Sequence, residues 1–88
     1  MEKRVLGTIS ILTSNRQSSS AAMNQLLTDF GHHIMARLGV NINRQCVESC
    51  PGLITLTVDS KKDLLIELVA KLNAIPEIKA EMCIMMEE

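Results

Sequence analysis

Apolar side chains recur at every second position in four separate segments of this 88-residue chain. A period of two is typical of β-strands that bury one face. It predicts strands over residues 5–12, 32–43, 53–58 and 78–86. In the second of these, one face would carry His32, Ile34, Ala36, Leu38, Val40 and Ile42, and the other His33, Met35, Arg37, Gly39, Asn41 and Asn43.

Two stretches between these strands have apolar residues at helical spacing instead. The first predicts a helix with Ala22, Met23, Leu26, Leu27 and Phe30 on one face and Gly31 at its C-cap. The second predicts a helix that begins with Ser60 as N-cap, has Asp63 in its first turn and ends near Asn73 and Pro76. Its buried stripe would consist of Leu64, Leu65, Leu68, Val69 and Leu72.

The resulting order is β-α-β-β-α-β, with Gly7 permitting close approach of a helix or strand to the first strand. Right-handed crossovers in both halves favour one α+β domain over residues 1–88. We expect a ferredoxin-like fold, in which a four-stranded antiparallel sheet carries both helices on one face. The other face would stay open and would carry Arg37 among apolar residues, namely Leu6, Leu12, Met35, Cys83 and Met85.

The composition makes the core of this domain light. Phe30 is the only aromatic residue, and six Met contribute to the apolar content. A small domain with such a core and a half-apolar open face gains stability by association. We therefore expect a homo-oligomer, either a dimer or a tetramer.

Charge and cysteine content exclude other classes. Nine Lys and Arg against ten Asp and Glu do not suit binding to nucleic acid. No apolar run is long enough for a membrane span, and no signal peptide is apparent. Three cysteines, an odd number, favour free thiols and a cytoplasmic location.

The segment Gly31–Val40 resembles the Gly-x-x-Ile-x-x-Arg-x-Gly-Ile stretch of the iron-only hydrogenase system regulators. The resemblance continues through Leu53–Asp59 and Leu68–Ile75, although Asn73–Pro76 replaces a glycine-containing turn of the family. These regulators are stand-alone ACT-like domains, similar in structure to the C-terminal domain of nickel-responsive regulators. The resemblance implies a non-catalytic, oligomeric regulatory domain linked to hydrogenase maturation, without a DNA-binding segment of its own.

The resemblance to ACT-like domains also implies an effector pocket between subunits, formed by the loop after the first strand and the second strand. The matching candidates here are Asn15, Arg16, Ser18, Arg37 and Gly39. Arg37 has a second interpretation, a salt bridge to Glu81 or to an acidic residue of another subunit. Gly39 and Asn41 stand where the nickel-responsive regulators have histidines, so we expect no nickel site and no cofactor.

A metal or redox sensor is the alternative function. It would use Cys46 and Cys50 together with His32 or His33, although three residues separate the cysteines where such motifs usually have two. Cys83 is interpreted as a small apolar filler. No Ser/His/Asp grouping on loops and no glycine-rich phosphate loop is present, so we expect no catalysis.

Overall fold

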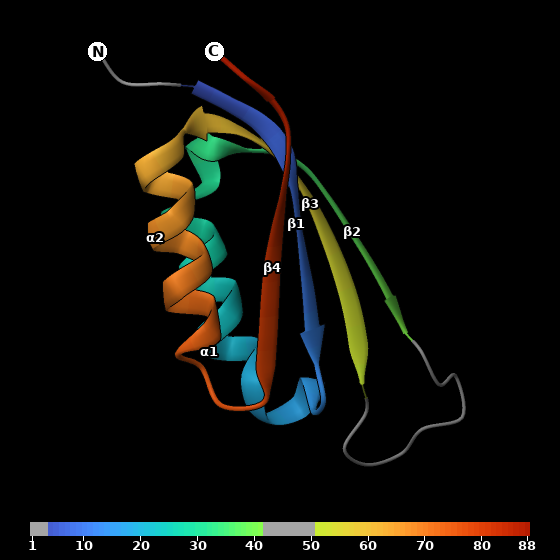
Figure 1. The fold of residues 1–88 in the computed structure, drawn as a ribbon. Helices are drawn as coiled ribbons and strands as arrows, with labels where there is room; N and C mark the ends of the chain where they lie inside the picture. Colours follow the sequence, from blue (N-terminus) through green and yellow to red (C-terminus); the bar gives the residue numbers. More distant parts are fainter. Residues whose placement is uncertain (1–3, 42–50) are drawn as a thin grey trace.

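The computed structural model describes residues 4–41 and 51–88. Its elements are β1 (Arg4–Thr13), α1 (Arg16–Asp29), a 3-10 turn η1 (Gly31–His33), β2 (Ile34–Asn41), β3 (Gly52–Lys61), α2 (Lys62–Asn73) and β4 (Ile78–Glu87). The strands form one antiparallel sheet in the order β2-β3-β1-β4, and both helices cover the same face (Figure 1). The predicted ferredoxin-like α+β fold is confirmed.

The core lies between the helices and the face of the sheet that they cover, here called the helix face. Alternate residues of β1 and β3 point into it, as the period of two predicts. Leu65, Leu68 and Leu72 of α2 are fully buried against them. The buried apolar residues also include Val5, Ile9, Ile11, Met23, Leu27, Phe30, Ile54, Leu56, Val58, Ile78 and Ala80. None of the described residues of β2 belongs to this buried set, so the core ends before that edge strand.

Gly7 marks the closest approach of β1 to β4. It pairs with Ile84 beside a shift in the register of the two strands between Leu6 and Gly7. A Cβ atom on Gly7 would overlap the backbone carbonyl oxygen of Cys83. The close approach predicted at this glycine is therefore confirmed, with a strand as the neighbour.

Shifts in register change which residues face the helices. Between β2 and β3, Ile34 pairs with Val58 and Ala36 with Thr57, so Met35 is an extra residue. Arg37 then lies opposite the buried Leu56, on the helix face. The prediction that Arg37 lies on the open face is wrong, because a bulge reverses the alternation.

The same effect changes the faces of other side chains. Leu38 pairs with Thr55 and therefore lies on the open face, whereas the alternation predicts it on the face opposite to Arg37 and Met35. In β4, Met86 pairs with Leu6 on the open face, although it was predicted on the same face as Ile84. In both strands an extra residue, Met35 in β2 and Met85 in β4, shifts the pairing by one position, so the regular alternation fails.

Helix ends differ from the predicted caps at two places. Ser60 is buried in β3, and Lys61 precedes α2 without a side-chain cap. Pairing of β3 with β1 continues as far as Lys61 and Arg4, which leaves Ser60 in the strand. Gly31 has no positive φ and begins η1 instead of capping α1. Asp63 does lie in the first turn of α2, as predicted.

Asn73 ends α2 and attaches it to β4. Its Nδ2 donates to the carbonyl oxygen of Ala80 at 3.0 Å, and its Oδ1 accepts from the Ala80 N–H at 2.8 Å. These are the backbone groups that β4, an edge strand, would otherwise present outward at this position. The side-chain amide therefore caps part of a sheet edge, which is one way in which proteins prevent edge-to-edge pairing.

The second face of the sheet, here called the open face, has none of the described helices over it (Figure 1). Leu38 is 68% exposed and Met86 is 58% exposed there. Leu12 and Leu53, which pair with each other, are also exposed. Cys83 pairs with Thr8 on this face, as predicted, but it is exposed and so does not act as an apolar filler within one copy.

Substitution of Gly7 tests the contact between β1 and β4. We expect Gly7→Ala to lower the free energy of unfolding by about 3 kcal/mol, because the backbone of Cys83 must move to admit a methyl group. Gly39→Ala is the matched control, since its Cβ would meet only Ile54 Cγ1 at 3.6 Å, an ordinary contact. We expect that variant to stay within about 0.5 kcal/mol of the parent in urea unfolding. Equal effects of the two substitutions would contradict the assignment.

Candidate functional site

Arg37 and Gly39, two of the predicted ligand residues, lie on the helix face of β2. Gly39 pairs with Ile54, as Arg37 pairs with Leu56. Nη2 of Arg37 donates to Oδ1 of Asn24 on α1 at 3.0 Å. The predicted salt bridge between Arg37 and Glu81 is absent from the described residues, because Glu81 pairs with Lys79 at 3.6 Å on the opposite edge strand.

A cavity of about 190 Å³ lies beside Arg37, between the end of α1 and β2. Its lining consists of Leu27, Thr28, Gly31, Ile34 and Arg37. Ile34 packs against the edge of the core beside it, and the hydrogen bond between Arg37 and Asn24 links β2 to α1 nearby. The site therefore combines apolar walls with one guanidinium group.

The other predicted ligand residues lie in the loop after β1 and in the first turn of α1. The carbonyl oxygen of Asn15 accepts hydrogen bonds from the hydroxyls of Ser18 and Ser19, at 3.3 and 2.8 Å. Arg16 is the first residue of α1, and the placement of its side chain lies outside the described part of the structure. Ser19 is buried, and its Oγ lies 2.6 Å from Oγ1 of Thr13.

The chain supplies its own carboxylate to this helix start. Oε2 of Glu77 accepts from the hydroxyl of Ser18 at 2.5 Å, and the Glu77 carbonyl oxygen accepts from the N–H of Ser14 at 3.0 Å. Glu77 has a positive φ of 68°, in the turn that leads into β4. The start of α1, which would favour an anion, is thus next to an acidic side chain of the protein.

The five predicted ligand residues therefore form two groups. Ser18 contacts the turn before β4, whereas Arg37 belongs to β2, and these strands are opposite edges of the sheet. The sequence analysis missed Asn24 and Glu77, which contact the two groups. Neither belongs to a motif. The Pro76-Glu77 step before the last strand is the only local signal, because it marks a turn.

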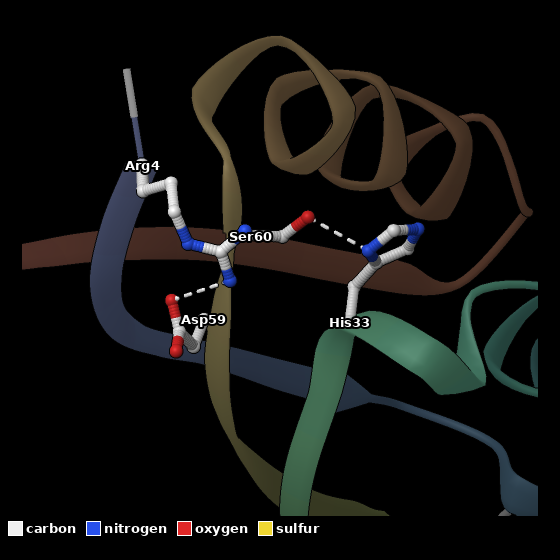
Figure 2. Close-up of polar contacts among 4 residues, drawn as sticks. All are labelled: Arg4, His33, Asp59 and Ser60. Atoms are coloured by element: carbon white, nitrogen blue, oxygen red, sulfur yellow. Dashed lines mark hydrogen bonds and ion pairs between the residues drawn. The ribbon is translucent and has the colours of Figure 1, made fainter. Parts of the chain in front are cut away.

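His33 forms a serine–histidine pair on the helix side of β3. Its Nδ1 lies 2.7 Å from Oγ of Ser60, and Figure 2 shows the Ser60 side chain directed toward the ring. Such a distance would suit a nucleophile and its base. Ser60 is only 3% exposed, however, and the neighbouring carboxylate of Asp59 is paired with Arg4 at 3.1 Å. The pair is thus placed to join η1 to β3 within the fold.

The residues of the alternative metal or redox hypothesis are only partly described. His32 is exposed in η1, and His33 is joined to Ser60, whereas Cys46 and Cys50 lie outside the described residues. Both histidines belong to η1, so the prediction that they begin a strand is wrong. Among residues 4–41 and 51–88, no three His, Cys, Asp or Glu side chains gather at one point. The metal hypothesis stays a prediction.

With the geometry in place, the chain can be compared with known proteins. The model of the family described as "TM1266-like: Iron-only hydrogenase system regulator, putative" matches residues 5–82. The chain belongs to this family. The resemblance read from Gly31–Val40 and the later segments is thereby confirmed. No curated protein matches the chain.

Solved structures agree on the fold. The uncharacterized protein TM1266 from Thermotoga maritima has a TM-score of 0.82 at 22% identity, over 94% of this chain and 99% of that one. An unknown protein from Galdieria sulphuraria has a TM-score of 0.70 at 12% identity, over 94% of this chain and 51% of that one.

A third structure is that of "a putative PII-like signaling protein" from Thermus thermophilus. Its TM-score is 0.63 at 9% identity, over all of this chain and 91% of that one. At these identities the three likenesses show the fold alone. In the described part of this chain, no helix has the length and apolar character needed to cross a membrane.

A double-mutant cycle measures the Ser60–His33 contact. We expect Ser60→Ala and His33→Ala each to destabilise the fold, and the double variant to lose about 1 kcal/mol less than the sum. His33 also packs against Phe30, with ring centroids 6.1 Å apart, and the cycle removes that contribution. The measurement is urea unfolding of all four proteins. Strict additivity would show that the hydrogen bond contributes nothing.

Proposed function

We propose that this chain is a regulatory domain that acts as a homo-oligomer and binds a small ligand or a protein partner where subunits meet. Membership of a regulator family supports the regulatory role. The same family description supports a link to an iron-only hydrogenase system. The observation that carries the proposal of self-association is the open face of the sheet.

The open face has the composition of an interface. Leu12, Leu38, Leu53 and Met86 expose much of their side chains on it, and the bulge residues Met35 and Met85 are 65% and 71% exposed nearby. A monomer would leave these apolar groups in water. Full burial of an exposed leucine side chain contributes about 2 kcal/mol, and each of these partly exposed residues would gain a share of that when a second copy covers it.

Charges on the open face suit a second copy of the same chain. Lys79 and Glu81 form an ion pair at 3.6 Å on β4, beside Ser10, Leu12 and Leu53. A hollow of about 200 Å³ lies among these five residues. In a two-fold arrangement the lysine of one copy can pair with the glutamate of the other, since an isologous interface is self-complementary.

Face-to-face packing is favoured over pairing at the β4 edge. The amide of Asn73 already occupies the outward backbone groups of Ala80 on β4. A further strand added at this edge would have to displace it. The open face meets no such obstacle, because every described helix lies on the other side of the sheet (Figure 1).

Replacement of Leu38 tests the role of this face. We expect the parent protein to have the mass of a dimer or tetramer at micromolar concentration in light scattering. Leu38→Lys places a charge in the proposed interface, and we expect it to shift the mass toward that of a monomer. Because Leu38 is 68% exposed within one copy, the folded monomer should keep its circular dichroism spectrum.

Ile66→Lys is the matched control, since Ile66 is 48% exposed on α2, in the layer opposite the open face. We expect this variant to keep the mass of the parent. A monomeric parent protein would overturn the proposed assembly. So would an equal loss of mass in the two variants.

A further inference from the structure

We propose that the groove between α1 and β2 binds a small organic carboxylate, with Arg37 as the group that holds the anion. The inference rests on the proposed function in one respect, that this regulatory domain takes a small ligand. It differs in location, because the groove lies on the helix face of one copy and not on the open face.

Arg37 has a charge that the described residues do not neutralise. Its hydrogen bond at 3.0 Å goes to the side-chain amide of Asn24, which is neutral. In residues 4–41 and 51–88 the ion pairs involve other cations, and Arg37 takes part in none of them. Arg4, in contrast, is neutralised by an ion pair, since its Nη2 lies 3.1 Å from Oδ1 of Asp59. A guanidinium held by a neutral partner keeps donors for a carboxylate.

The shift in register at Met35 explains why the guanidinium lies here. Without the extra residue, Arg37 would project from the open face, where the regular alternation had placed it. With it, Arg37 lies opposite Leu56, at the border of the apolar core. Bulges often redirect a side chain beside a functional site, and here the redirected residue is the only charged one among the described residues that line the cavity.

The surroundings suit an anion with an apolar part. Leu27 and Ile34 form apolar walls, and Thr28 and Gly31 complete the lining. The end of α1 would disfavour an anion if its carbonyl groups were free. One of them, that of Leu26, accepts from the N–H of Phe30, and the carbonyl group of Phe30, just beyond the helix, accepts from the N–H of His33.

The size of the groove limits the ligand. A volume of about 190 Å³ corresponds to roughly six water molecules in the liquid. A monocarboxylate with a short branched chain fills this space, with the carboxylate on Arg37 and the methyl groups against Leu27 and Ile34.

Isovalerate is the probe that tests this assignment. We expect a titration followed by ¹H–¹⁵N NMR to shift the amide signals of Thr28, Gly31 and Ile34 in a saturable way. The neutral alcohol 3-methylbutanol has the same carbon skeleton, and we expect it to bind at least about tenfold more weakly, because it lacks the charge-assisted hydrogen bonds. Equal binding of acid and alcohol would overturn the role of Arg37, and no saturable shift with isovalerate would overturn the site.

Variants separate the role of Arg37 from a general effect of positive charge. We expect Arg37→Gln to weaken isovalerate binding about tenfold or more, and Arg37→Lys to give an intermediate loss because one ammonium replaces a two-pronged donor. Arg4→Gln removes the ion-paired arginine and should leave binding unchanged. Equal losses in Arg37→Gln and Arg4→Gln would contradict the proposal.

The same samples keep this proposal separate from the proposed assembly. Arg37 does not lie on the open face, so Arg37→Gln should retain the parent's mass in light scattering. Binding of isovalerate by a monomeric protein would support the groove and overturn the assembly. An oligomer that does not bind isovalerate would support the assembly and overturn the groove.

Discussion

Coverage of the sheet on one face alone is the constraint on which the rest of this structure depends. The apolar residues of β1 and β3 that face α1 and α2 form one side of the buried core, and residues of the two helices form the other. The described part of the chain has two α-helices, and both are used on that side. Leucine and methionine side chains on the second face consequently stay exposed, and the core ends before β2. The open face and the groove beside Arg37 therefore have the same cause, which is that two helices do not cover the whole sheet.

The order of elements could be predicted from the sequence because it depends on periodicity, which the chain displays clearly. The close approach at Gly7 was also predictable, since a glycine within a strand pattern indicates one. The faces of Arg37, Leu38 and Met86 were not predictable, because each follows a shift in register. Such a shift depends on pairing with another strand, and no glycine or proline marks Met35 or Met85 as extra residues.

Local rules failed in a similar way where tertiary contacts decide. Ser60 is a good helix cap by residue type, yet its hydroxyl meets His33 and it stays in β3. The candidate ligand residues were separated because Ser18 contacts Glu77, a residue 59 positions away in the sequence. The sequence identified residue types suited to binding. Which of them meet is set by contacts between distant segments, and these become visible only in the folded chain.

β2 is the element that the groove and the open face share. Arg37 projects to the groove and Leu38, its neighbour in the chain, projects to the open face. Among the described strands, β2 pairs only with β3, so it has fewer constraints than the central strands. A carboxylate that fixes Arg37 also fixes the backbone that positions Leu38. The bulge at Met35 thus decides at once which residue of β2 lines the groove and which is presented on the open face.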